Sequence, residues 1–520
     1  MRKLALVLLL TVCARAQEHP RDKQIHDADT LAWWHTTEAL SGDDMEGRDT
    51  GSAAYMRAAK YVEGRFQAAG LKPAGDGGTY LQTIGFHEVA VAGDGTSFSV
   101  VRAGGETQLE FLEQITVTPA VSMLDEAEAP LTFRGYCGKE TMQEIAGRIV
   151  VCFASQRTGM PSAAERAANA RAGDAVGIVN VDDPFFTIEP PRWPAAYART
   201  VMTNGSARAA ARPLLTMRLK SEELATVIAG SGRDAVAILA AGGHKEPLES
   251  FDIPAKMRVK LHVTERSYSS PNVLAMLPGS DPTLAHEVVV IAAHLDGYGY
   301  GTAVKGDNLY NGALDDAAYV ALLIQFADDV KAGRLAAPRR SVLVCAFTGE
   351  EKGLLGSNYF VAHPTVERER LSADINLDQL RPLFPLKILT AEGIDDTTLG
   401  DTARAVGRSM GIALRPDMEP ERGLLHRADE YPFLRIGVPG IGFIFGYDPG
   451  TEAERRYREW YEVRYHRPQD DLTQPMDFDA AAKFDQFFYR LTEAVANAPV
   501  KPAFKPGSSF APKLAAAKFE

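Results

Sequence analysis

Cysteine is scarce in this chain of 520 residues, which contains four. So few cysteines cannot build a disulfide scaffold. Beyond the first residues, no apolar run is long enough to cross a bilayer. No block of lysine and arginine stands out and the net charge is −12, which argues against nucleic acid as a partner. The composition is that of a globular protein, 45% hydrophobic and 24% charged, and the length predicts two to four domains.

The first sixteen residues have the pattern of a signal peptide. Arg2 and Lys3 precede a short apolar run, which ends in a small-x-small sequence. We predict cleavage after Ala16 and a secreted or periplasmic protein without membrane insertion. A lipid anchor on Cys13 is disfavoured, because the bulky Val12 stands where such a site has a small residue.

Three cysteines lie beyond the predicted cleavage site. Cys345 is part of an apolar strand pattern, so we expect a buried thiol. Cys137 and Cys152 are free to pair in an exported protein, and the sequence leaves that pairing open.

The pattern of apolar and polar residues changes in the middle of the chain. Residues 120–245 contain short strand patterns and an alanine-rich helix, and we predict that they form a separate, β-rich α+β insert. From about residue 270, apolar strands alternate with amphipathic helices. That alternation predicts a doubly wound, mostly parallel α/β sheet flanked by helices.

The insert divides the main domain into two parts along the sequence. We assign residues 17–119 to its N-terminal part and 246–500 to its C-terminal part, which carries the chemistry described next. Residues 501–520 are rich in proline and lysine and are predicted to be a loose tail.

Each major strand of the C-terminal part ends in side chains that can bind a metal. His294 and Asp296 stand at the end of the first strand, Glu350 and Glu351 at the end of the second, and Asp378 at the end of the third. Ligands of such sheets bind beyond the carboxyl ends of the strands. These side chains are therefore expected to meet at one edge.

Two further candidates lie outside the strands. Asp315 opens the helix after the first strand, and His466 lies in a polar loop near the C-terminus. Each residue alone has an ordinary explanation: Asp315 suits the first turn of a helix, and His466 suits an exposed surface. Their joint occurrence with the strand-end residues favours a metal centre.

The paired glutamates are expected to have different tasks. Side chains of neighbouring residues at the end of a strand point in roughly opposite directions. One carboxylate can then bind a metal while the other moves a proton. A positioned carboxylate of this kind contributes about 10²- to 10⁴-fold to a hydrolytic rate.

The chain resembles the exported dizinc aminopeptidases of metallopeptidase family 28, which also includes glutamate carboxypeptidase II and the glutaminyl cyclases. The resemblance rests on five motifs in the expected order: "AAHLDG", "GALDDAA", "FTGEEKGLLGS", "NLD" and "YHRPQDD". The insert, with "IAGRIVV" and "ARAGDAVGIVNV", resembles a protease-associated domain. Together these similarities cover nearly the whole mature chain.

The resemblance implies a metal centre with two Zn²⁺ ions, for which Mn²⁺ or Co²⁺ can substitute. His294 and Asp378 would hold one ion, Glu351 and His466 the other, and Asp315 would bridge them. These three carboxylates and a metal-bridging hydroxide balance the +4 charge of the ions.

The resemblance also assigns catalytic roles. Glu350 would be the general base. Asp296 would bind no metal itself and would orient the imidazole of His294. These two residues complete the predicted catalytic set.

The chain departs from the family pattern at two places. Asp316 stands where the family usually has asparagine, and the stretch "HRADEYPF" has Ala428 and Glu430 where relatives have serine and histidine. The candidate substrate-pocket residues follow from this stretch and from the arginines near the motifs. They are Asp429, Glu430, Arg427 and Arg381.

Four functions compete at this point, with peptides as the expected substrates and the oligomeric state left open. The first is an aminopeptidase. The second is a carboxypeptidase, which needs a cation such as Arg381 or Arg427 for the terminal carboxylate. The third is a single-zinc glutaminyl cyclase, which would be a shorter chain without an insert. The fourth is a non-catalytic binding module, which would have lost ligands that this chain retains.

Overall fold

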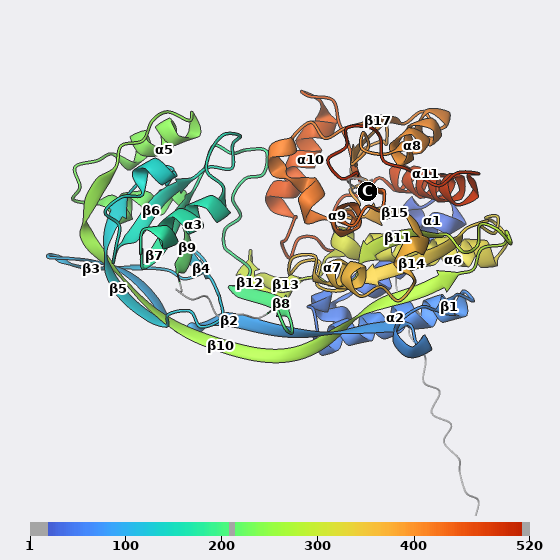
Figure 1. Ribbon diagram of the computed structural model, residues 1–520, viewed down its shortest axis with the longest axis horizontal. Helices are drawn as coiled ribbons and strands as arrows, with labels where there is room; N and C mark the ends of the chain where they lie inside the picture. The colour runs from blue at the N-terminus through green and yellow to red at the C-terminus, as the bar shows by residue number, and fades with distance from the viewer. Residues whose placement is uncertain (1–18, 207–213, 512–520) are drawn as a thin grey trace, which may run out of the picture.

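The computed structural model describes residues 19–206 and 214–511. The predicted signal peptide, residues 1–16, lies outside the described residues. The chain forms two lobes that are joined by two very long strands (Figure 1). Within the described ranges, no helix combines the length and the apolarity that a membrane crossing requires.

The larger lobe is built on the predicted doubly wound sheet, and this fold prediction is confirmed. Its neighbouring strands run in the order β17, β16, β18, β15, β11, β14, β10. The pairs β11–β14, β11–β15 and β15–β18 are parallel, whereas β10–β14 and β16–β18 are antiparallel. The strands of this lobe are β1 (Lys72–Pro73), β11 (Val288–His294), β12 (Gly299–Val304), β13 (Asp307–Tyr310), β14 (Ser341–Phe347), β15 (Leu371–Leu377), β16 (Ile388–Glu392), β17 (Ala413–Arg415) and β18 (Gly440–Phe445).

Helices cover both faces of this sheet. One face packs against α1, α2, α6 and α11, and the other packs against α7 and α9. Because both faces are covered, β11, β14 and β15 are buried along their whole length, as the largely apolar sequences of β11 and β14 predict. The helices of this lobe are α1 (Ala28–Ser41), α2 (Ala53–Ala68), α6 (Ala318–Lys331), α7 (Leu355–Ala362), α8 (Thr398–Ser409), α9 (Glu430–Arg435), α10 (Glu452–Val463) and α11 (Phe478–Asn497).

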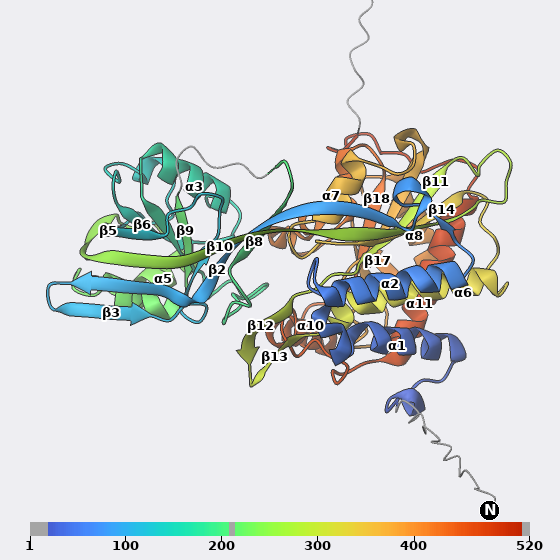
Figure 2. The same cartoon turned by 90° about the horizontal axis from the view of Figure 1, so that it is seen from below.

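Strands β2 (Leu81–Arg102) and β10 (Phe251–Leu277) run through both lobes and pair with each other in antiparallel register. Figure 2 shows them extending from the larger lobe into the smaller one. In the first half of β10, buried and exposed residues alternate, with Met257 and Val259 inward and Arg258 and Lys260 outward. This period of two is that of a strand with one solvated face.

The smaller lobe contains the predicted insert but is wider than predicted. Its apolar core includes Val91 and Leu261, so both long strands contribute to it, and the boundaries 120 and 245 were too narrow. Its elements are β3 (Gly105–Leu109), β4 (Ile115–Thr118), β5 (Glu126–Phe133), β6 (Ile149–Ala154), α3 (Ala163–Ala172), β7 (Gly177–Asp182), β8 (Arg199–Thr203), β9 (Leu215–Leu219), α4 (Leu224–Ile228) and α5 (Ala235–Gly243).

Two further predictions can be compared with the structure. Cys137 and Cys152 form a disulfide with Cα atoms 5.6 Å apart, and Cys345 is a free, buried cysteine as expected. The start of the predicted loose tail is attached instead. Lys505 Nζ lies 2.7 Å from an Asp401 carboxylate oxygen, and Ser508 donates a hydrogen bond to Asp396.

Candidate active site

Three neighbouring parallel strands end at the candidate site. β11 lies between β14 and β15 and ends at His294. The register pairs His294 with Phe347, the last residue of β14, so Glu350 and Glu351 follow immediately beyond it. Asp378 directly follows β15. The strand ends therefore bring together the side chains that the sequence predicted to meet.

The first group of possible ligands consists of His294, Asp315 and Asp378. Each offers one ligand atom, and these atoms lie within 4.8 Å of one another. His294 Nε2 is 3.1 Å from Asp315 Oδ1 and 3.8 Å from Asp378 Oδ1. An imidazole nitrogen with two carboxylate oxygens is a donor set that suits zinc.

The second group consists of Asp315, Glu351 and His466, again within 4.8 Å. His466 Nε2 is 3.4 Å from Asp315 Oδ2 and 3.2 Å from Glu351 Oε2. Asp315 therefore belongs to both groups and offers one oxygen to each. We call the two groups together, with Glu350 beside them, the candidate metal centre.

The candidate metal centre holds more buried negative charge than its own hydrogen bonds satisfy. Asp315 Oδ2 and Asp378 Oδ1 are buried and have no hydrogen-bond partner. Burial and the neighbouring carboxylates raise the pKa of Glu350 and of Glu351 well above the usual range. Unpartnered carboxylate oxygens of this kind are what bound cations satisfy, so the residues fit the predicted metal ions.

The environment of His466, the histidine of the second group, favours its neutral form. Burial lowers the pKa of His466 to about 3. Its Nδ1 lies 2.8 Å from the hydroxyl of Tyr298, which fixes the ring so that Nε2 faces the carboxylates. A neutral imidazole with its second nitrogen held by a neighbour is the form that binds metals. The sequence analysis missed Tyr298, which follows the "AAHLDG" motif by one residue.

Asp296 has a different role from the predicted one. The backbone carbonyl of Asp296, not its carboxylate, lies 3.0 Å from His294 Nδ1, while the carboxylate is 3.9 Å away. The carboxylate instead accepts hydrogen bonds from the backbone amide of Glu350 (3.1 Å) and from the Thr50 hydroxyl (2.8 Å). Asp296 therefore positions the loop that carries the paired glutamates.

Asp315 and His294 are fixed by buried polar groups, of which the sequence analysis singled out only Asp316. The Asp470 carboxylate accepts hydrogen bonds from the backbone amides of Leu314 and Asp315. The carboxylate of Asp316 accepts one from the backbone amide of His294 at 3.1 Å. Arg48, fully buried, donates to the backbone carbonyls of the loops on either side of the site.

A family model matches the part of the chain that builds this site. Residues 272–492 match the model of peptidase family M28. These residues form an M28 peptidase domain. The predicted family is thereby confirmed, while the resemblance of the insert to a protease-associated domain stays a prediction.

Curated relatives of this chain carry peptidase names. The leupeptin-inactivating enzyme 1 of Streptomyces exfoliatus is 24% identical over 310 residues, which are 57% of this chain and 65% of that protein. A probable leucine aminopeptidase 2 of Aspergillus oryzae is 26% identical over 218 residues, 39% of this chain and 40% of that protein. The aligned regions thus span less than two thirds of either relative.

Solved structures resemble this chain over both lobes. An aminopeptidase from Aneurinibacillus sp. strain AM-1 superimposes with a TM-score of 0.62 at 18% identity, covering 92% of this chain and 96% of that one. A zinc aminopeptidase from Bacillus subtilis gives 0.56 at 16% identity, with 90% and 95% covered. At identities this low, the likeness establishes the fold.

Two arginines predicted to line the substrate pocket of the M28 domain are engaged elsewhere. Arg381 is completely buried and stacks on the rings of Trp460 and Tyr461. It therefore belongs to the core, and its assignment to the pocket was wrong. Arg427 does line a pocket, but its guanidinium pairs with Glu189 of the smaller lobe at 2.8 Å.

The two predicted acidic pocket residues differ as well. Asp429 is buried against Ser357, whose hydroxyl donates a hydrogen bond to it. Glu430 lines a pocket next to Asp378, together with Glu392, which the sequence analysis did not single out. We call this cavity the side pocket; its other lining residues are Asn376, Gln379, Leu424, Arg427, Ala428, Gly442, Phe443 and Ile444.

The loop between β7 and β8, residues 183–198, connects the smaller lobe to the site. Besides the pairing of Glu189 with Arg427, the guanidinium of Arg192 stacks over Tyr465, the residue before His466. The hydroxyl of Tyr197 accepts a hydrogen bond from Lys352, the residue after Glu351. The smaller lobe therefore contacts the neighbours of the ligand residues.

Proposed function

We propose that this protein is a secreted exopeptidase with two zinc ions, and that it acts as an aminopeptidase on peptides. The observation that carries the proposal is that Asp315 offers one oxygen to each of two ligand groups. A signal peptide over residues 1–16 would direct the chain out of the cytoplasm.

The proposed ligands are those of the two groups. His294 and Asp378 would hold one ion, Glu351 and His466 the other, and Asp315 both. When bound, the ions supply Lewis acidity, which makes water a nucleophile near neutral pH and polarises the scissile carbonyl. Zinc agrees with the name of the zinc aminopeptidase from Bacillus subtilis, and the same ligands accept Mn²⁺ or Co²⁺.

Glu350 is proposed as the general base. It takes a proton from the attacking water and passes it to the nitrogen of the leaving group. Its carboxylate lies 3.9 Å from His294 Nε2 and lines an open cleft together with Glu351, Tyr298 and His466. The hydrogen bond from its backbone amide to Asp296 holds it there.

Both arginines that the sequence offers to a carboxypeptidase are engaged, which favours an aminopeptidase, while Arg435 at the open cleft has no ion-pair partner among the described residues. A carboxypeptidase needs a free cation for the terminal carboxylate of its substrate. Arg381 is stacked in the core, and Arg427 is paired with Glu189. The relative and the solved structures that are named aminopeptidases point the same way. A second ligand group and the insert also disfavour a single-zinc glutaminyl cyclase.

We further propose that the smaller lobe, as a protease-associated insert, forms one wall of the site. The contacts from residues 183–198 to Arg427, Tyr465 and Lys352 support this role. Removing the loop contacts should change KM for peptides more than kcat for small substrates, since small substrates do not reach the wall.

The test of the function is a panel of substrates given to the zinc-loaded protein. It contains aminoacyl 4-nitroanilides with a free amine, the same compounds with an acetylated amine, and N-blocked dipeptides with a free carboxylate. We expect cleavage of the free-amine compounds alone, loss of activity with a chelator, and recovery with zinc. Cleavage of the blocked dipeptides instead would replace the aminopeptidase by a carboxypeptidase.

A further inference from the structure

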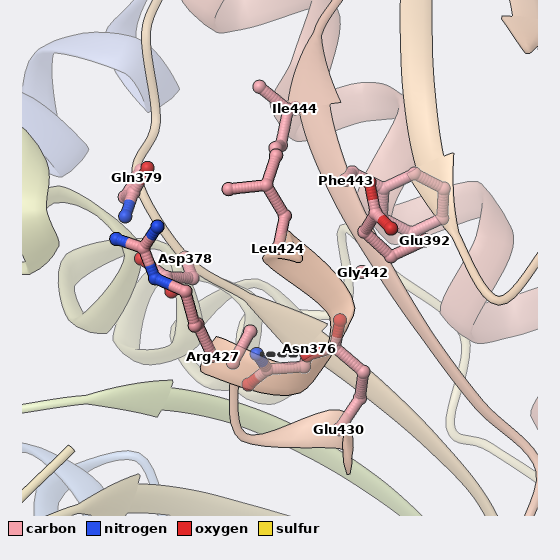
Figure 3. Close-up of a pocket in the computed structure, with 11 residues that line it drawn as sticks. Asn376, Asp378, Gln379, Glu392, Leu424, Arg427, Glu430, Gly442, Phe443 and Ile444 are labelled. Atoms are coloured by element: carbon pink, nitrogen blue, oxygen red, sulfur yellow. Dashed lines mark hydrogen bonds between the residues drawn. The ribbon is translucent and has the colours of Figure 1, made fainter. Parts of the chain in front are cut away.

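The side pocket opens beside Asp378, a proposed ligand, and is therefore next to the reacting bond (Figure 3). It shares Arg427 with the open cleft that Glu350 and Glu351 line. A side chain that enters it would belong to a residue whose backbone lies at the candidate metal centre. In an aminopeptidase, that residue is the N-terminal one.

Two glutamates face this cavity without a cationic partner. Glu392 ends β16 and is 7% exposed, and Glu430 begins α9 and is fully buried. One carboxylate oxygen of each is buried without a hydrogen-bond partner, and the other Glu430 oxygen accepts from Asn376 at 2.8 Å. Among the described residues, neither glutamate has an ion-pair partner within 4.0 Å.

The absence of a side chain at Gly442 leaves room for the carboxylates of Glu392 and Glu430. Gly442 of β18 pairs with Glu392 across the sheet, and a Cβ atom at position 442 would lie 2.5 Å from Glu430 Oε1. Any other residue there would push the Glu430 carboxylate out of its position. The backbone thus leaves room for two acids at one end of the pocket.

The arginines closest to these acids are bound to another acid. Arg427 lines the pocket, but its guanidinium pairs with Glu189 and lies on the Gln379 side, away from Glu392 (Figure 3). Arg422 lies 3.7 Å from a Glu189 carboxylate oxygen and 3.4 Å from one of Glu419, and two of its guanidinium nitrogens are buried without a hydrogen-bond partner. Glu189 of the smaller lobe therefore competes with Glu392 and Glu430 for both cations.

The remaining walls suit an aliphatic chain. Leu424, Phe443 and Ile444 provide apolar surface in the pocket. The side pocket has a volume of about 30 Å³, which leaves room for a terminal ammonium beyond a stem that lies along these walls. Lysine has this shape, since it buries its methylene stem along apolar surface and ends in a compact ammonium.

We propose that the side pocket binds the side chain of the substrate's N-terminal residue and selects lysine, with Glu392 and Glu430 as the specificity-determining acids. This inference rests on the proposed aminopeptidase function. The ammonium would take the unpartnered oxygens of the two carboxylates as acceptors. Charge-assisted hydrogen bonds in a buried site are strong enough to separate lysine from an uncharged side chain of similar length.

The experiment compares lysine and norleucine 4-nitroanilides, which differ chiefly in the terminal charge, on the zinc-loaded full chain. We expect kcat/KM for lysine to exceed that for norleucine at least about tenfold. Glu392→Gln should bring the ratio close to one by lowering kcat/KM for lysine. Glu430→Gln should do the same, and Glu392→Gln keeps the test open if the buried Glu430 variant does not fold.

A binding measurement and a matched control complete the design. In calorimetric titrations, free lysine should bind more tightly than free norleucine. This preference should be lost in Glu392→Gln. Glu421→Gln, an exposed position, should keep the wild-type ratio. Norleucine cleaved as well as lysine, or a ratio unchanged in Glu392→Gln, would overturn the inference. Failure to cleave any free-amine substrate would instead overturn the proposed function.

Discussion

The candidate metal centre and the side pocket are adjacent, and both are lined by buried carboxylates, yet their chemistry differs. In the centre, imidazole and carboxylate atoms of two groups converge within 4.8 Å. In the side pocket, Glu392 and Glu430 line one cavity without any histidine, together with the apolar Leu424, Phe443 and Ile444. Convergent mixed ligands suit divalent ions, whereas paired acids at the end of an apolar channel suit one organic cation. The surroundings of a buried acid thus decide which cation it binds.

The largest effect should come from Glu350, the carboxylate of the candidate metal centre that is proposed to bind no metal. Glu350→Gln should lower kcat by about 10²- to 10⁴-fold, because the proton of the attacking water loses its acceptor. Both zinc equivalents should remain, measured by plasma mass spectrometry after gel filtration. Glu351→Gln is the matched comparison and should lose metal. If Glu350→Gln lost metal instead, the roles of the two glutamates would be exchanged.

Most of the candidate metal centre was predictable because its residues stand at strand ends. Parallel strands of similar length bring their carboxyl ends together, so His294, Glu351 and Asp378 had to meet once the strands were recognised. The role of Asp296 was not predictable. Whether its carbonyl or its carboxylate reaches His294 depends on the backbone conformation of the two residues that follow β11.

The side pocket and the second lobe show where sequence patterns end. Glu392 and Glu430 are 38 positions apart in the chain and come from a strand and a helix that the sheet order makes neighbours. The pairing of Glu189 with Arg427 joins two lobes across 238 positions. Neither contact has a local pattern. The alternation in the first half of β10 did have one, and a period-two search would have found that strand.

Metal removal should destabilise the larger lobe. The acids of the candidate metal centre would then face one another without compensating cations. At a free zinc concentration a hundredfold above Kd, each site adds about 2.7 kcal/mol to the free energy of unfolding. We therefore expect a chelator to lower Tm in a thermal scan and zinc to restore it.

The matched control for that scan is Asp315→Asn, which removes the residue shared by both ligand groups. Its Tm should already be low and should change little on chelation. Equal Tm values for wild type with and without chelator would contradict the assignment of a metal centre.

A smaller effect is expected from Glu189, whose substitution should alter the side pocket and leave the candidate metal centre unchanged. Glu189→Gln releases Arg427 and Arg422, which can then neutralise Glu392 and Glu430. We expect the lysine-to-norleucine ratio of kcat/KM to fall by up to about tenfold, mainly through KM for lysine. The norleucine kcat is the internal control and should stay near the wild-type value. A ratio that stays constant would mean that Glu189 does not protect the pocket charge.

The smallest effect concerns stability against pH. Burial and, less strongly, Asp417 raise the pKa of Glu392 to about 8, while Arg422 opposes the shift. A carboxyl whose pKa is higher in the folded than in the unfolded state holds an extra proton when folded between these two values. Its contribution to stability is therefore present below about pH 4.5 and is lost as the pH rises through about 8.

Glu392→Gln removes this dependence, since the amide does not titrate. Between pH 5 and 8, Tm of the zinc-loaded wild type should fall more than Tm of Glu392→Gln, by a few degrees at most for a chain of this size. Glu421→Gln should follow the wild type. Parallel curves for wild type and Glu392→Gln would show that Glu392 is already ionised in the free protein. In that case a cation of the protein already compensates the Glu392 carboxylate before any substrate binds. The side pocket would then differ less from the candidate metal centre in how its acids are compensated.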